Sequence, residues 1–194
     1  MKFIIHRVNT IKELKNIPKE YGCEIDIRTD GSNLILNHDP FRKGDNLIDY
    51  LDEYRNGILV LNIKESGIED LVLEEVRKRN IKLYFLLDVE FPYLYSASEN
   101  GEKNIAVRFS EKEPIENLYL FKNKVNWAWI DTITKNPIER SNINILRDFK
   151  SCIVCPSRWG RESDIIDYKI QLSKFNYQME AVMTNINLIK KWKI

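Results

Sequence analysis

Short runs rich in β-branched and aromatic residues alternate with amphipathic stretches along the whole chain of 194 residues. No linker rich in proline, glycine and serine and no low-complexity block interrupts this alternation. Strands that are separated by helices favour a parallel sheet assembled from βα units. Eight such units in series predict an α/β fold, a small (β/α)8 TIM barrel that occupies residues 1–194 as a single domain.

The predicted strands and helices follow one another with short connections. The strands are expected at 3–6, 23–28, 58–64, 84–89, 105–110, 127–132, 151–157 and 181–185. The helices are expected at 10–19, 46–55, 68–79, 92–99, 114–122, 137–149 and 161–175, with a last turn at 188–192. Three of these helices begin with proline, whose missing N–H costs nothing at that position. A further strand at 34–37 follows Asp30-Gly31-Ser32 and is expected to form a hairpin with the second strand.

The charge of the chain is balanced, with 30 basic and 29 acidic residues and a formal net charge of +1. This balance gives no global field that would draw nucleic acid or an anionic membrane, so phosphate binding is expected to be local. The apolar run at the start is too short for a secretory signal, and no stretch approaches a membrane span. Three cysteines are an odd number, and Cys152 and Cys155 lack the partners of a zinc site, so buried strand cysteines and a cytoplasmic location are expected.

The two histidines, His6 and His38, each end a short apolar run and lie on either side of the second predicted strand. Within that strand, Glu24 and Asp26 alternate with apolar residues and therefore share one face. Imidazole exchanges protons near neutral pH, and carboxylate oxygens bind hard cations. This combination predicts a metal-assisted acid/base site.

Polar residues also stand at the ends of the later predicted strands, where a barrel places its active site. Asn62 and Lys64 share a face of the third strand, and Trp129 alternates with Asp131 on the sixth. Such charges are explained equally by the lining of one active-site opening and by structural ion pairs at the ends of the strands. Trp129 could contact the substrate or pack in the core. The candidates for substrate binding from these strand ends are Lys64, Asp88, Arg108, Trp129 and Arg158.

Three segments of the chain resemble the glycerophosphodiester phosphodiesterase family of the phospholipase-C-like phosphodiesterases. They are His6-Arg7, Glu24-Ile25-Asp26, and the hairpin that runs from Asp30-Gly31 to His38-Asp39. The family follows these motifs with E-x-K on its third strand, where this chain has Asn62-Ile63-Lys64. The resemblance is strong over residues 1–64 and weaker beyond, where 181–185 is similar to the family's final strand.

The resemblance implies a TIM-barrel hydrolase of lipid metabolism that acts on a small phosphodiester. It implies a divalent cation, Mg²⁺ or Ca²⁺, on Glu24, Asp26 and the third-strand position Asn62. It gives His6 and His38 the roles of general acid and base, in an order that the sequence does not assign. Arg7 and Lys64 would neutralise phosphate oxygens, and Asp39 would support His38.

Asn62 departs from the family, because a neutral amide replaces a carboxylate ligand and weakens a hard-cation site. Two alternatives to a metal-assisted hydrolase follow. One is a non-catalytic relative that binds a phosphorylated sugar or lipid headgroup. The other is a metal-independent lyase like the phosphatidylinositol phospholipases C, which uses two histidines. The identity of the substrate and the oligomeric state stay open at this stage.

Overall fold

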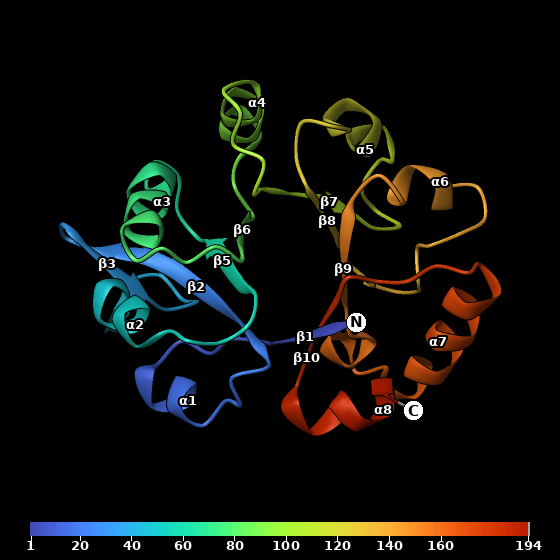
Figure 1. Cartoon of the computed structure of the whole chain (residues 1–194), viewed down its shortest axis with the longest axis horizontal. Coiled ribbons are helices and arrows are strands. Elements are labelled where there is room, and N and C mark those ends of the chain that lie inside the picture. Colours follow the sequence, from blue (N-terminus) through green and yellow to red (C-terminus); the bar gives the residue numbers. More distant parts are fainter. Residues whose placement is uncertain (194) are drawn as a thin grey trace. The chain divides into compact units, whose positions relative to one another are not determined.

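A computed structural model describes residues 1–193 of the chain. The chain forms two compact units, one of residues 4–95 and the other of residues 1–3 together with the part from Ser96 onward. Both units contain parallel strands with helices in the connections (Figure 1). The one-domain organisation that the sequence suggests stays a prediction.

Four parallel strands run in the order β1-β2-β5-β6 in the unit of residues 4–95, although the first two residues of β1 belong to the other unit. The pairing of Ile5 with Cys23 and of Asp26 with Asn62 fixes the register of its first three strands. The four strands are β1 (Lys2–Ile5), β2 (Gly22–Asp30), β5 (Leu59–Ile63) and β6 (Tyr84–Leu87). β3 (Asn33–Leu36) pairs antiparallel with β2 and with the short β4 (Asp45–Asn46).

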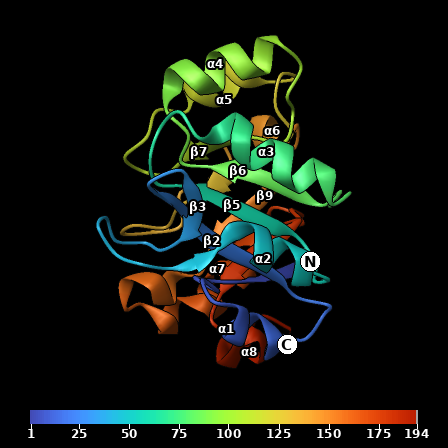
Figure 2. The same ribbon diagram turned by 90° about the vertical axis from the view of Figure 1, so that its left-hand side faces the viewer.

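The helices of this unit are α1 (Ile11–Lys15), α2 (Leu47–Glu53), α3 (Glu69–Lys78) and α4 (Phe91–Glu99), the last of which crosses the boundary between the units. Helices α2 and α3 cover one face of the sheet (Figure 2). The apolar side chains of β2, Cys23, Ile25 and Ile27, are fully buried. Because side chains alternate along a strand, Glu24 and Asp26 lie on the opposite face.

Two connections in this unit show why the sequence folds as it does. Thr10 and Glu13 form a capping box that begins α1. Gly44 passes so close to β3 that a Cβ atom there would lie 2.1 Å from the carbonyl oxygen of Leu36, so only glycine fits. Gly44 therefore fixes the path of the chain between β3 and β4.

The other unit repeats the parallel pattern with four strands in the order β7-β8-β9-β10. These are β7 (Ala106–Phe109), β8 (Trp127–Ile130), β9 (Lys150–Val154) and β10 (Ala181–Thr184). The helices are α5 (Glu116–Phe121), α6 (Ile143–Leu146), α7 (Ile165–Lys174) and α8 (Ile189–Lys193), with 3₁₀ turns η1 (Pro156–Trp159), η2 (Glu162–Asp164) and η3 (Ile186–Leu188). None of the helices in residues 1–193 is long and apolar enough to span a membrane.

Every predicted strand is present, with ends that shift by a few residues, whereas the predicted helix at 137–149 is wrong. Only α6 is helical there. The Asn142 amide donates to the Pro137 carbonyl and accepts from the Glu139 N–H, and Asn136 accepts from the Ile138 N–H. These side chains occupy backbone groups that a helix would use. Proline consequently does not begin a helix at 137, and Pro114 lies two residues before α5.

Candidate active site

The first strand delivers His6 and Arg7 to the carboxyl end of the sheet in the unit of residues 4–95. Arg7 has a positive φ of 55°, a conformation that non-glycine residues seldom adopt. This turn points the Arg7 N–H at Glu24, whose Oε2 accepts it at 2.8 Å. His6 Nε2 lies 4.0 Å from the same oxygen. The two predicted residues therefore meet the predicted carboxylate.

Asp26 is completely buried and lies at the centre of a polar cluster. Its Oδ2 accepts a hydrogen bond of 2.8 Å from Asn9 and lies 3.9 Å from the Arg7 Nε. Its Oδ1 lies 3.5 Å from the Lys64 Nζ. Asn9 Oδ1 also accepts a hydrogen bond from the backbone N–H of Asp26, so Asn9 contacts both the backbone and the side chain of this residue. Asn9 is not indicated by the strand pattern of the sequence, because it lies three residues after His6, just past the first strand.

Asn62 and Lys64 reach the cluster from β5, as the register predicts. Asn62 pairs with Asp26 between the strands, and its amide donates to Glu24 Oε1 at 2.8 Å. Lys64 donates to Asp88 Oδ2 at 3.2 Å, so its ammonium group lies between two carboxylates. Residues that follow β1, lie within β2, lie at the end of β5 or just after it, and follow β6 thus form one site.

Two buried carboxylates side by side raise the proton affinity of the site. Burial is the largest cause that raises the pKa of Glu24, to about 7, and the charge of Asp26 adds to it. Hydrogen bonds from Asn62 and from the Arg7 N–H, and the charge of Lys64, act in the opposite direction. The raised pKa of Glu24 therefore reflects chiefly its burial away from water, with a smaller contribution from the charge of Asp26.

The hairpin brings His38 and Asp39 to the same end of the sheet. The Arg28 guanidinium donates to the carbonyl oxygens of His38 and Lys64, at 3.1 and 3.0 Å. His38 Nδ1 and Asp39 Oδ1 are 2.8 Å apart, and this hydrogen bond is the main cause that lowers the pKa of the exposed Asp39 carboxyl. A carboxylate on Nδ1 orients the ring and directs Nε2 outward for proton exchange.

The donors in this cluster fit a hard divalent cation in their chemistry. Asp26 Oδ1 and Asn62 Oδ1 are buried and accept no hydrogen bond from the described residues. With Glu24 they offer two carboxylates and one amide oxygen, which suit Mg²⁺ or Ca²⁺. Because Asn62 is neutral, the set carries less negative charge than three carboxylates would. Residues 1–193 contain no cluster of three or more histidine, cysteine or acidic side chains placed to hold a metal.

Three of the predicted substrate-binding residues belong to the other unit. Arg108 forms ion pairs with Glu113 at 2.6 Å and with Asp131 at 2.9 Å. Arg158 lies 5.7 Å from the ring of Trp159. Trp129 is only 4% exposed, which supports packing in the core over contact with a ligand. The ion pairs of Arg108 correspond to the structural alternative that the sequence left open, and binding of substrate by these three residues stays a prediction.

Solved structures supply the comparison that sequence does not, because no protein-family model and no curated protein matches the chain. A putative glycerophosphoryl diester phosphodiesterase from Agrobacterium tumefaciens aligns over 100% of this chain and 97% of its own, with a TM-score of 0.70 and 8% identity. One from Parabacteroides distasonis aligns over 94% and 81%, with a TM-score of 0.65 and 15% identity. A glycerophosphodiester phosphodiesterase from Agrobacterium tumefaciens aligns over 94% and 96%, with a TM-score of 0.64 and 11% identity.

These alignments establish the class of fold. The chain has the fold of the glycerophosphoryl diester phosphodiesterases over its whole length. The (β/α)8 class that was predicted from the sequence is thereby confirmed, and so is the resemblance at the level of the fold.

Proposed function

We propose that this protein is a divergent member of the glycerophosphodiester phosphodiesterase family and hydrolyses a small phosphodiester. The observation that carries the proposal is the meeting of His6, Arg7, Glu24, Asp26 and Lys64 at the carboxyl ends of adjacent strands. Imidazoles, carboxylates and fixed cations are the groups that phosphodiester cleavage requires. The fold of known phosphodiesterases around this cluster supports the same reaction class.

The cations have the chemistry to bind the phosphodiester. Arg7 has its guanidinium at the edge of the site, with the side chain 36% exposed, and Lys64 lies deeper. Both would neutralise nonbridging oxygens, on which charge builds up in the transition state.

The two histidines differ in their surroundings, and this difference suggests their roles. His38 is fixed through Nδ1 by Asp39 and would accept the proton of the attacking water at Nε2. His6 lies 4.0 Å from Glu24, so an imidazolium there would be paired with a carboxylate. His6 would accordingly donate a proton to the leaving alkoxide.

A divalent cation, Mg²⁺ or Ca²⁺, would be held by Glu24, Asp26 and Asn62. When bound, it would polarise the phosphoryl oxygens and add positive charge to the site. Glu24 and Asp26 are held in place by Asn9, Asn62 and the Arg7 N–H before any ligand arrives, so little reorganisation would accompany binding.

One observation favours a second candidate, a function that needs no cation. The Lys64 ammonium lies 3.5 Å from Asp26 Oδ1, the oxygen that a cation would use. In this alternative Lys64 and Arg7 bind the phosphate themselves, either in a binding protein without turnover or in a lyase that uses the two histidines. The neutral amide of Asn62 is compatible with both.

The test is turnover of glycerophosphodiesters and of bis-p-nitrophenyl phosphate, with Mg²⁺, Ca²⁺, Mn²⁺ or EDTA. Activity that EDTA abolishes and that falls by at least a hundredfold in His38→Asn supports the metal-assisted hydrolase. Activity indifferent to EDTA supports the lyase. No turnover under any of these conditions would refute the hydrolase.

Two variants of Asn62 distinguish a site that binds its cation too weakly for full activity from a site that does not catalyse the reaction. Asn62→Glu restores the third carboxylate, and Asn62→Gln has the same length without the charge. If only Asn62→Glu raises metal-dependent turnover, the natural site is limited by its ligands. If the native protein is silent and Asn62→Glu is active, binding is the present function.

A further inference from the structure

Phe41 is the most exposed large hydrophobic residue among residues 1–193. Its relative exposure is 104%, and the next is Ile166 at 63%. Phe41 also has a φ of 59°, a left-handed conformation that is strained for a bulky side chain. A ring held fully in water at such a position gains nothing from the fold itself. Its placement therefore points to a contact outside this chain.

The loop that presents Phe41 is braced at its base. It connects β3 to β4, and the Asn37 amide donates to the Lys43 carbonyl at 2.9 Å while its oxygen accepts from the Asp39 N–H. Gly44 then lies against the backbone of Leu36. Because both ends of the loop 37–44 are held, the exposure of its tip is a property of the fold.

The residues beside Phe41 give the tip a positive charge. Arg42 and Lys43 are exposed, and neither forms an ion pair with any of the described residues. The loop also contains His38 and Asp39, so the same eight residues carry a proposed proton-transfer group and the apolar tip. The charge of Arg42 reaches Asp39, whose pKa it helps to lower.

We propose that the loop 37–44 docks the active site onto an anionic lipid surface. Phe41 enters the apolar part of the interface, and Arg42 and Lys43 contact the lipid phosphates. An aromatic ring beside basic residues is the combination that binds such surfaces. The inference rests on the proposed phosphodiesterase function and specifies its substrate class, a phosphodiester that is presented in a lipid assembly. His38 would then meet the headgroup at the surface.

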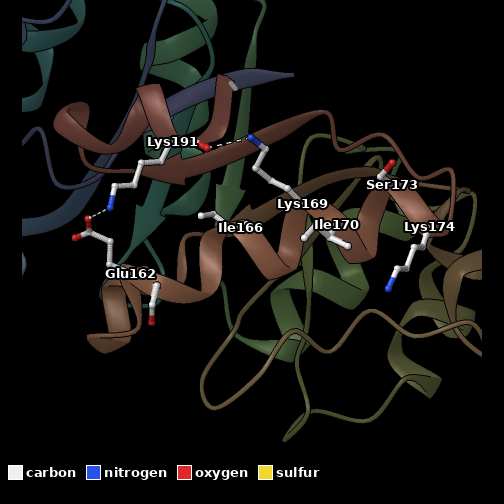
Figure 3. Close-up of a pocket in the computed structure, with 8 residues that line it drawn as sticks. Glu162, Ile166, Lys169, Ile170, Ser173, Lys174 and Lys191 are labelled. Atoms are coloured by element: carbon white, nitrogen blue, oxygen red, sulfur yellow. Dashed lines mark hydrogen bonds and ion pairs between the residues drawn. The ribbon is translucent and has the colours of Figure 1, made fainter.

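A second apolar and basic surface provides an internal control. A groove of about 630 Å³ follows α7, with Ile166 and Ile170 between Lys169, Lys174 and Lys191 (Figure 3). Two of its three ammonium groups are engaged, because Lys191 pairs with Glu162 and Lys169 donates to the Lys191 carbonyl. None of the residues that line it belongs to the candidate site.

The experiment is sedimentation of the protein with vesicles of phosphatidylcholine alone or mixed with phosphatidylglycerol, at low and high salt. We expect binding to the mixed vesicles, weakening as salt rises. Phe41→Ser should weaken it by about tenfold or more, since an inserted ring is lost. The double variant of Arg42→Gln and Lys43→Gln should weaken it and flatten its salt dependence. Ile166→Ser is the matched control and should bind as the native protein does.

Turnover supplies a second readout. The rate on a lysophospholipid in vesicles, divided by the rate on water-soluble glycerophosphocholine, should fall in Phe41→Ser by the same factor as vesicle binding. Equal vesicle binding by Phe41→Ser and the native protein would overturn the inference. A native protein that does not bind vesicles, or a loss of binding that occurs in Ile166→Ser but not in Phe41→Ser, would overturn it as well. Vesicle binding that depends on Phe41 without turnover of any phosphodiester would keep the docking surface and refute the proposed catalytic function.

Discussion

Lys64 is the residue whose removal tests the electrostatics of the site most directly. Its ammonium group lies 3.5 Å from a carboxylate oxygen of Asp26, which is completely buried, and 3.2 Å from Asp88. Lys64→Met keeps the length of the side chain and removes the charge. Among residues 1–193, the Asp26 carboxylate would then keep an ion pair with the Arg7 guanidinium alone, at 3.9 Å.

The free energy of unfolding that Lys64→Met is expected to lose is large relative to the total stability of a small protein. Two unit charges 3.5 Å apart attract by about 5 kcal/mol at an effective dielectric constant of about 20. Breaking a buried pair by removing one partner costs about 3–5 kcal/mol. Because Arg7 and Asn9 still contact Asp26, we expect the lower end, about 3 kcal/mol. Domains are commonly stable by only about 5–15 kcal/mol.

Urea unfolding at neutral pH measures the free energy of unfolding of native and variant protein. The matched control is Lys78→Met, since the Lys78 side chain is 54% exposed and its ion pairs lie on the surface, where such pairs contribute at most about 1 kcal/mol. Asp26→Asn combined with Lys64→Met completes a double-mutant cycle, with an expected coupling of about 2–3 kcal/mol. Ca²⁺ or Mg²⁺ should raise the melting temperature of Lys64→Met more than that of the native protein, because the cation replaces the missing charge.

A variant Lys64→Met that is as stable as Lys78→Met would refute this reasoning. It would mean that Asp26 and Lys64 do not carry opposite charges in contact. A normal loss of stability without rescue by either cation would keep the ion pair and argue against cation binding by Glu24, Asp26 and Asn62.

The remaining predictions concern a helix cap, a close backbone approach and the cysteines. Thr10→Ala should lower the free energy of unfolding in urea by about 1 kcal/mol, since Thr10 Oγ1 accepts the Glu13 N–H at 3.1 Å; an unchanged midpoint would refute the cap. Gly44→Ala should lower the melting temperature more than Gly31→Ala does, because its Cβ would lie 2.1 Å from the Leu36 carbonyl oxygen, whereas Gly31→Ala meets no atom within 4 Å and costs only the strain of a φ of 61°; the opposite order would contradict the close approach. Ellman's reagent should label none of the three cysteines until the protein is unfolded, since all are buried and burial raises the pKa of Cys23 to about 12; rapid labelling of the folded protein would show that one is accessible.

The core of the site followed from the sequence because strands have simple geometry. Glu24, Asp26, Asn62 and Lys64 were assigned to common faces from the two-residue period, and parallel register places Asp26 beside Asn62. What the sequence does not contain is the choice of hydrogen-bond partners. Asn9 lies in a connection that has no periodic pattern, yet it forms hydrogen bonds with both the carboxylate and the backbone N–H of Asp26.

The error in the helix predicted at 137–149 has a local physical cause. The apolar spacing in 137–149 indicates a helix, but the side chains of Asn136 and Asn142 take the backbone groups that the helix would need. The ion pairs of Arg108 are a second feature that the sequence leaves open, while binding of substrate by Arg108 stays a prediction. Its charge is matched by Asp131 on the neighbouring strand segment and by Glu113 in the following connection. Such pairings depend on tertiary placement, which a single sequence leaves open.

The contacts at the base of the loop 37–44 fix the position of His38 and leave the side chains at the tip of the loop unconstrained. Arg28 holds the His38 carbonyl, and Asn37 and Gly44 hold the base of the loop, so none of these constraints uses a side chain of residues 40–43. Positions 40–43 are therefore free to vary in evolution or in a mutant library without moving His38. Substitutions in this short segment could therefore change which substrates or surfaces the protein binds, while the geometry of the candidate active site stays the same.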